Sequence, residues 1–124
     1  MKLLFIWLLV SVATPRSVLA PKVESPILGL WFAADLHNST IKVYQARDGL
    51  IYGKIVKSDN KDWIGEVILK KVRYDAKSNT WKGEVYSLTM FFTVGVELSL
   101  LSEAKLKIVG TRFFMSKTFY WKKV

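Results

Sequence analysis

The chain has 124 residues and no cysteine, and 19 lysines and arginines against 10 aspartates and glutamates give it a formal net charge of +9. The lack of cysteine excludes disulfide-stabilised folds, thiol catalysis and thiolate metal sites. A hydrophobic fraction of 51% allows one small domain to fold on apolar burial and hydrogen bonds alone.

The first twenty residues have the pattern of a secretory signal peptide. Lys2 supplies a positive start, an apolar run covers residues 3–13, and residues 18–20 form a small-x-small cleavage site. The run is shorter than the ~20 residues of a membrane span, and an uncleaved anchor helix is the alternative. We expect a signal-peptide helix cut after Ala20, a linker at 21–26, and a periplasmic or secreted mature chain of 124 − 20 = 104 residues.

The mature chain stays strongly basic. Removal of Lys2 and Arg16 leaves 17 basic and 10 acidic residues, a net charge of +7. Such an excess favours an anionic partner such as phospholipid headgroups or lipopolysaccharide. Nucleic acid is not a usual functional partner of an exported protein, so we expect no nucleic-acid partner. The charges are scattered along the sequence, and a surface that serves solubility alone is the alternative.

Residues 27–124 alternate apolar and polar side chains in short segments separated by turn residues, a pattern typical of β-strands. Asp48-Gly49 is a strong hairpin signal between two such segments. The clearest period of two runs from Met90 to Leu100, with the even-numbered residues on one face. Residues 111–117 are interpreted as a connector rich in phenylalanine. The predicted strands are 27–33, 40–46, 50–56, 66–74, 80–86, 90–100, 105–110 and 118–124.

Eight short strands joined by tight turns predict an all-β domain over 27–124, a small antiparallel up-and-down barrel, because closure removes unpaired edges. A sandwich is the alternative. A barrel of this size is only just wide enough to be filled by side chains or to hold one small ligand. The inward candidates are bulky, so we expect a mostly packed interior with at most a shallow cup at one mouth. They are Trp31, Ile41, Val43, Ile55, Trp81, Val85, Phe92, Val94, Val96, Leu98, Leu106, Ile108, Phe119 and Trp121.

Gly29-Leu30-Trp31 resembles the Gly-x-Trp that opens lipocalin-like (calycin) barrels, and a longer series of motifs resembles the DUF2147 family of exported bacterial proteins of unknown function. The motifs are Ile41-Lys42-Val43-Tyr44, Asp48-Gly49, Tyr52-Gly53-Lys54-Ile55-Val56, Gly65 with Ile68-Leu69, Trp81-x-Gly83 with Val85-Tyr86, Leu106-x-Ile108-x-Gly110 and Lys117-Thr118-x-x-Trp121. The resemblance implies a lipocalin-like barrel and an exported location, and no activity.

In lipocalin-like folds a basic side chain of the last strand packs over the first tryptophan, which the resemblance implies for Lys122 or Lys123 over Trp31. Two segments depart from the DUF2147 pattern. Residues 87–90 read Ser-Leu-Thr-Met where the family has Asp-Pro and a glycine turn, and the loop at 58–64 is shorter than is usual. A function carried by either loop would be altered here.

Residues for catalysis or metal binding are few, and we expect no enzyme, cofactor or metal site. His37 and Ser39 are adjacent loop residues, which seldom have triad geometry. Asp59 and Asp62, with Asn60 between them, offer oxygens to Ca²⁺ but lack the spacing of an EF-hand loop. Glu84 and Glu97 lie opposite the apolar face and are interpreted as solvated or paired with Lys82 or Lys105; a buried general acid is the alternative.

Aromatic and basic residues interleave over residues 112–123, a combination that stacks bases, sits at lipid headgroups, or simply closes a barrel with its last strand. We expect a monomer, and the sequence suggests two candidate functions. The first is binding of a small apolar or amphipathic ligand at the barrel mouth, which fold analogy favours. The second is a solid barrel acting on an anionic envelope component or partner protein. The candidate ligand-binding residues are Trp31, Tyr44, Tyr52, Trp81, Tyr86, Phe92 and Trp121.

Overall fold

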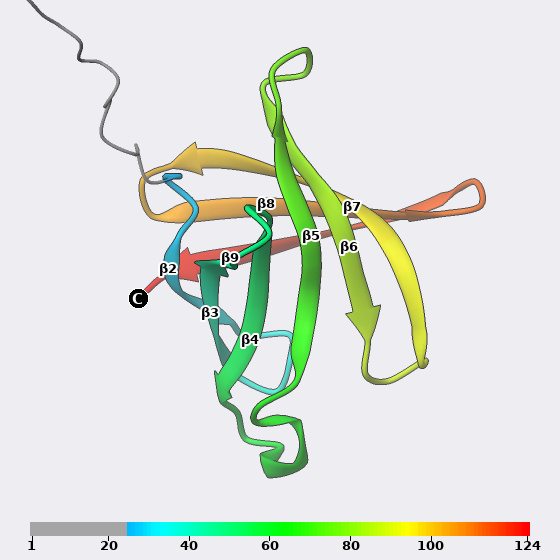
Figure 1. Cartoon of the computed structure of the whole chain (residues 1–124). Helices are drawn as coiled ribbons and strands as arrows, with labels where there is room; N and C mark the ends of the chain where they lie inside the picture. The colour runs from blue at the N-terminus through cyan, green and yellow to red at the C-terminus, as the bar shows by residue number, and fades with distance from the viewer. Residues whose placement is uncertain (1–24) are drawn as a thin grey trace, which may run out of the picture.

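The computed structural model describes residues 25–124, so the expected signal peptide and most of the expected linker lie outside the described residues. Eight antiparallel strands form a closed barrel in which each strand pairs with its neighbour in sequence and the last pairs with the first (Figure 1). The predicted all-β up-and-down barrel is therefore confirmed. The strands are β2 (Gly29–Ala33), β3 (Ser39–Gln45), β4 (Ile51–Lys57), β5 (Val67–Asp75), β6 (Thr80–Ser87), β7 (Phe92–Ser102), β8 (Lys105–Arg112) and β9 (Met115–Lys123).

A single 3-10 turn, η2 (Lys61–Trp63), interrupts the loop between β4 and β5. Asn60 caps it, because its side-chain oxygen accepts a hydrogen bond from the backbone N–H of Asp62 at 3.1 Å. Within residues 25–124, no helix has the length and apolarity needed to cross a membrane.

Two predicted boundaries are wrong at hairpin turns, and the first strand begins at Gly29, two residues later than predicted. The segment 111–117 is not a connector, because β8 continues to Arg112 and β9 begins at Met115. The strand predicted from Met90 begins at Phe92, and Met90 is exposed in the turn before it. Neither turn has a glycine or asparagine at its centre, so the usual sequence signals of a turn are missing.

The predicted inward face is confirmed by the burial pattern. All fourteen expected side chains are removed from solvent to a large degree: ten are buried, and the other four, on β6, β7 and β9, are half-buried. The core includes three tryptophans, Trp31, Trp81 and Trp121, which contribute the largest apolar areas.

Glycines on the inward face show how tightly the barrel is packed between β3 and β6. A β-carbon at Gly83 would lie 2.5 Å from a methyl of Val72 and 2.9 Å from the carbonyl oxygen of Lys70. A β-carbon at Gly53 would lie 2.9 Å from that of Leu69. These distances are below van der Waals contact, so neighbouring side chains fill the space there.

A β-bulge in β5 explains the close approach at Gly83. The register between β5 and β6 slips by one residue between Lys70 and Arg73, and Lys71 has a φ of 55°. The extra residue turns Val72 into the core, where it is fully buried. Its side chain occupies the volume that a side chain at Gly83 would need.

Lys123 packs over the buried ring of Trp31. Its Nζ lies 4.7 Å from the centroid of the indole ring and donates a hydrogen bond to the carbonyl oxygen of Leu28 at 2.8 Å. The indole N–H donates to the carbonyl oxygen of Ile27 at 2.8 Å. The lysine implied by the resemblance is thus Lys123, whereas Lys122 is on the other face of β9.

Candidate functional site

Basic residues gather on one half of the barrel. The strands β8, β9, β2, β3 and β4 are consecutive around the closed sheet. Between them these five strands carry nine basic residues and, over their full described length, no aspartate or glutamate. We call this surface the basic half. Its cations are Lys42, Lys54, Lys57, Lys105, Lys107, Arg112, Lys117, Lys122 and Lys123.

The remaining three strands mix the two signs of charge. Lys82 of β6 forms an ion pair with Asp75 of β5 at 3.1 Å, and it lies directly opposite Glu97 of β7. Lys70 of β5 lies directly opposite Glu84 of β6. Opposite charges on neighbouring strands offset one another. The excess positive charge of the barrel strands is therefore concentrated on the basic half.

One row of side chains crosses the seam where the chain's first and last strands meet. The register places Lys57 beside Thr40, Thr40 beside Phe32, Phe32 beside Lys122, and Lys122 beside Lys105. Phe32 and Thr40 lie between buried residues, and Lys122 and Lys105 each adjoin one, so these four side chains face outward. Lys57 is exposed, and the register shift beside Thr40 places it opposite that residue. We call these five residues the seam row: a half-buried aromatic ring with lysines on both sides.

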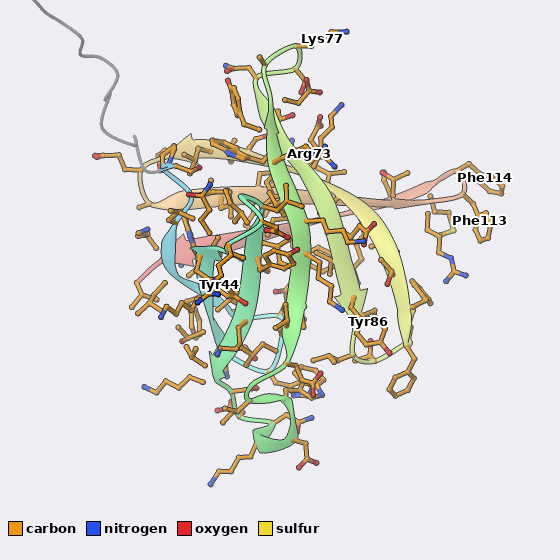
Figure 2. All side chains as sticks on the ribbon, viewed as in Figure 1. Tyr44, Arg73, Lys77, Tyr86, Phe113 and Phe114 are labelled. Atoms are coloured by element: carbon orange, nitrogen blue, oxygen red, sulfur yellow. The ribbon has the colours of Figure 1, made fainter. Side chains whose placement is uncertain are left out.

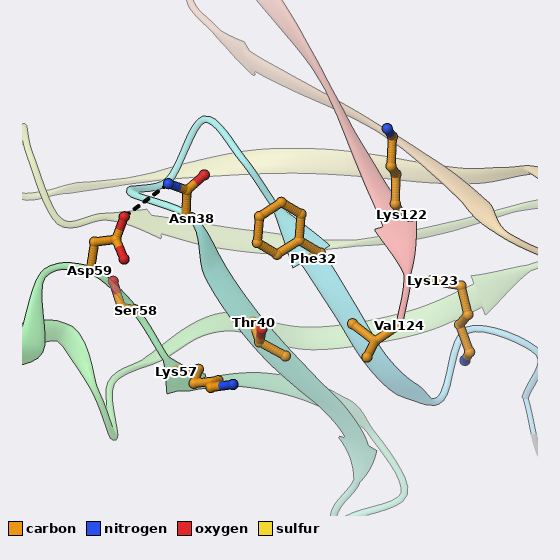
Figure 3. Close-up of a pocket in the computed structure, with 9 residues that line it drawn as sticks. All are labelled: Phe32, Asn38, Thr40, Lys57, Ser58, Asp59, Lys122, Lys123 and Val124. Carbon is orange, nitrogen blue, oxygen red and sulfur yellow. Dashed lines mark hydrogen bonds between the residues drawn. The ribbon is translucent and has the colours of Figure 1, made fainter.

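An open depression of about 550 Å³ lies on this seam (Figure 3). Figure 3 shows the Phe32 ring between Asn38 and Lys122, with Thr40 and Lys57 below it in this view. The lining residues are Phe32, Asn38, Thr40, Lys57, Ser58, Asp59, Lys122, Lys123 and Val124. The depression is outside the barrel wall, so it differs from the cup at the mouth that the sequence predicts.

The depression can accept a group that is both apolar and anionic. Phe32 offers a flat apolar surface, and the Lys57 and Lys122 ammonium groups are exposed cations beside it. The acidic lining residue, Asp59, is held at the edge, where its carboxylate accepts a hydrogen bond from the Asn38 amide at 2.8 Å. Phosphate or carboxylate groups at the end of an apolar chain have this combined chemistry.

The structure does not bring the seven candidate ligand-binding residues together. Trp31, Trp81, Phe92 and Trp121 alternate in step with the core and face inward, whereas the three tyrosines face outward on β3, β4 and β6. Figure 2 shows Tyr44 and Tyr86 on separate parts of the barrel.

The three tyrosines have local partners. Tyr44 and Tyr52 are opposite each other on β3 and β4, and their rings stack with centroids 6.2 Å apart. The Tyr52 hydroxyl donates to Asp48 at 2.6 Å, and this bond is the main cause that lowers the pKa of Asp48 and raises the pKa of Tyr52. The Tyr86 ring has Lys70 Nζ 5.7 Å from its centroid. These contacts stabilise the outer surface and define no pocket.

The residues considered for catalysis contact other side chains and backbone groups of the fold. The His37 ring packs edge-on against Trp63 with centroids 4.7 Å apart. Ser39 is buried, and its hydroxyl bonds to the carbonyl oxygen of Leu36 and to Ser58. Glu97 accepts a hydrogen bond from the Thr80 hydroxyl at 3.0 Å.

For metal binding, the Asp59 carboxylate and Asn60 amide oxygen already accept the hydrogen bonds described above. Within residues 25–124, no three histidine, aspartate or glutamate side chains are grouped as metal ligands would be.

The seam row was not identified from the sequence, because its members come from the first three and the last two strands of the barrel, which are far apart in the sequence. One signal was present. The predicted strands that begin at 27, 40, 50, 105 and 118 contain no acidic residue, and only the closure of the barrel makes them neighbours.

Comparison with known proteins finds no family model, no curated protein and no solved structure that matches this chain. The resemblance to DUF2147 stays a prediction.

Proposed function

We propose that this protein is an interaction domain, a filled barrel that binds an anionic component of the cell envelope through its basic half. The observation that carries this proposal is the segregation of charge: nine cations and no carboxylate on five consecutive strands. Cations that lie close together add their potentials and attract a multivalent anion much more strongly than the same charges dispersed over a surface.

Packing supports an external rather than an internal site. The inward faces of Gly53 and Gly83 have no room for one methyl group, because Leu69 and Val72 fill the space. Ligand pockets typically need about 300–1,000 Å³. The seam depression, at about 550 Å³, has that volume on the outside of the wall. The interaction-domain hypothesis therefore has more support than the small ligand at the barrel mouth.

The predicted leader supports an envelope partner. A chain exported to the periplasm or beyond meets phospholipid headgroups and lipopolysaccharide, which share phosphate groups as their anionic chemistry. The seam row offers both an aromatic ring and lysines to such a group.

The test reverses three charges of the seam row and compares the result with an equal change elsewhere. The variant Lys57→Glu/Lys105→Glu/Lys122→Glu and the control Lys61→Glu/Arg73→Glu/Lys77→Glu have the same net charge, and the control cations are exposed but outside the basic half. Binding is measured by co-sedimentation with phosphatidylglycerol vesicles and with lipopolysaccharide at low and high salt.

Near an anionic membrane each lysine contributes about 1 kcal/mol, so removal of three lysines weakens binding by at least ~100-fold. The wild-type protein should bind, its affinity should fall as salt rises, and the control variant should retain most of it. Equal losses in the two variants would show that net charge alone matters. Salt-insensitive binding, or none to either anionic probe, would also refute the proposal.

A further inference from the structure

Two hairpin turns expose large apolar side chains. Met90 and Phe91, in the turn between β6 and β7, are 66% and 74% exposed. Phe113, Phe114 and Met115, at the turn between β8 and β9, are 84%, 97% and 71% exposed. Figure 2 shows Phe113 and Phe114 at the far end of a hairpin that extends away from the barrel. We call these two turns the aromatic tips.

Each aromatic tip has a phenylalanine in a backbone conformation that suits it poorly. Phe91 has a φ of 60° and Phe113 a φ of 58°, in the left-handed region that glycine and asparagine favour. The turn between β5 and β6 follows the usual preference, with Asn79 at a φ of 60°. Neither phenylalanine gains burial in return for its strain, so the folded chain does not explain the choice.

The two aromatic tips lie at the same end of the barrel. β7 begins at the first tip and the antiparallel β8 ends at the second. The Arg112 guanidinium joins them: its central carbon lies 3.7 Å from the centroid of the Phe92 ring and 5.1 Å from that of Phe113. Arg112 therefore links the start of β7 to the turn between β8 and β9.

Cations accompany the aromatic tips. Arg112 is exposed, and Lys117 is exposed with its Nζ 5.2 Å from the Phe119 ring. Neither β8 nor β9 contains an acidic residue, so the tip between them continues the basic half. Aromatic and apolar side chains at the end of a protrusion, with cations just behind them, match the layers of a bilayer interface.

We propose that the aromatic tips insert into the interface of an anionic phospholipid bilayer, while Arg112 and Lys117 contact lipid phosphates. This inference rests on the proposed function and names its partner. Charge complementarity favours the bilayer over a second copy of the chain, because two copies would bring the same cations together. The shape also favours it: two protruding turns enter a soft lipid layer without the matched cavity that a protein partner must supply.

The first test removes the apolar groups without straining the turns. In Phe91→Asn/Phe113→Asn, asparagine tolerates the left-handed backbone, so the fold should be kept or stabilised. The control is Leu101→Asn, which removes a side chain 53% exposed near the β7–β8 turn, at the opposite end of β7. Binding to vesicles of phosphatidylglycerol and phosphatidylcholine should fall at least ~10-fold for the double variant and little for the control.

The second test detects insertion directly. In Phe114→Trp, a new indole is placed at the most exposed apolar position of the chain's described part. On binding to anionic vesicles its fluorescence should shift to the blue and be quenched by brominated acyl chains. Subtraction of the wild-type signal removes the contribution of the native tryptophans.

The outcomes separate the two proposals. Salt-sensitive vesicle binding that is unchanged in Phe91→Asn/Phe113→Asn, with no quenching in Phe114→Trp, would overturn tip insertion and leave the proposed function standing. The absence of any binding to anionic probes would overturn both. Sedimentation of the free protein provides a further check: a dimer that the double variant dissociates, with vesicle binding intact, would assign the tips to self-association and contradict the inference.

Discussion

Three glycine-to-alanine substitutions test whether the barrel interior is filled. Gly53, Gly83 and Gly95 all lie inside strands, and none has a positive φ, so each loses the same backbone freedom on folding. At Gly83 the new methyl would meet Val72 at 2.5 Å and a backbone oxygen at 2.9 Å, whereas at Gly95 nothing lies within 4 Å. The contrast therefore isolates the room available to one methyl group.

Overpacking of a core costs about 1–3 kcal/mol, and replacement of glycine by alanine at a compatible site stabilises by about 0.4–1 kcal/mol. We expect Gly95→Ala to stabilise the barrel, and Gly83→Ala to destabilise it because the backbone oxygen cannot move aside cheaply. Gly53→Ala should fall between them, since the atoms near 3 Å belong to the side chains of Leu69 and Ile41.

The measurement is the free energy of unfolding from urea titration, with the melting temperature from circular dichroism as a second readout. A difference of about 2 kcal/mol between Gly83→Ala and Gly95→Ala corresponds to roughly 8–16 °C for a domain of this size. If the two variants were equally stable, the interior would have unfilled space beside Val72. The conclusion that the barrel is filled would then be wrong, and binding of a small ligand by the barrel would again be the better-supported function.

The remaining predictions concern single contacts. Lys123→Met should lower the free energy of unfolding by about 1–2 kcal/mol through loss of the cation–π contact, while Lys122→Met, which removes an exposed charge, should change it by less than about 0.5 kcal/mol in the same urea titration. Tyr52→Phe should raise the pKa of Asp48 toward its ordinary value of 3.8, as followed by carboxyl NMR. Because the folded pKa is depressed, the stability this bond adds is present above pH 3.8 and is lost as the pH falls below it; equal pH profiles for the two proteins would contradict this. Ser39→Ala should cost about 1–2 kcal/mol because a buried hydrogen-bonded hydroxyl is removed, and a melting temperature equal to that of wild type would count against it.

Local alternation carried most of the fold prediction, and its errors have a shared cause. The period of two along β7 correctly placed Val96 and Leu98 in the core. It failed at Met90 and at Phe113, where the chain turns without glycine or asparagine at the centre of the turn. Apolar residues at a turn look like strand residues, so pattern analysis extends the predicted strands into these two turns.

The candidate site was much less accessible to sequence reasoning. The sequence analysis predicted tyrosines and tryptophans as ligand contacts. In the structure the tryptophans fill the core, and Tyr44 and Tyr52 stack on the outer wall. Alternation with a period of two assigns a side chain to one face of its strand. It does not show which side chains of other strands lie beside it on that face.

By itself the sequence determined the eight strands, the buried face of every strand except β5, and the pairing of a terminal lysine with the first tryptophan, because each depends on local alternation or on a motif. Only the tertiary structure decided which charges are neighbours. Closure of β2 on β9 brings Phe32 beside Lys122 and joins five strands without a carboxylate. The bulge at Lys71 turned Val72 into the core beside Gly83. Closure and register depend on pairings between distant segments, and the free energy that selects them is shared over the whole sheet.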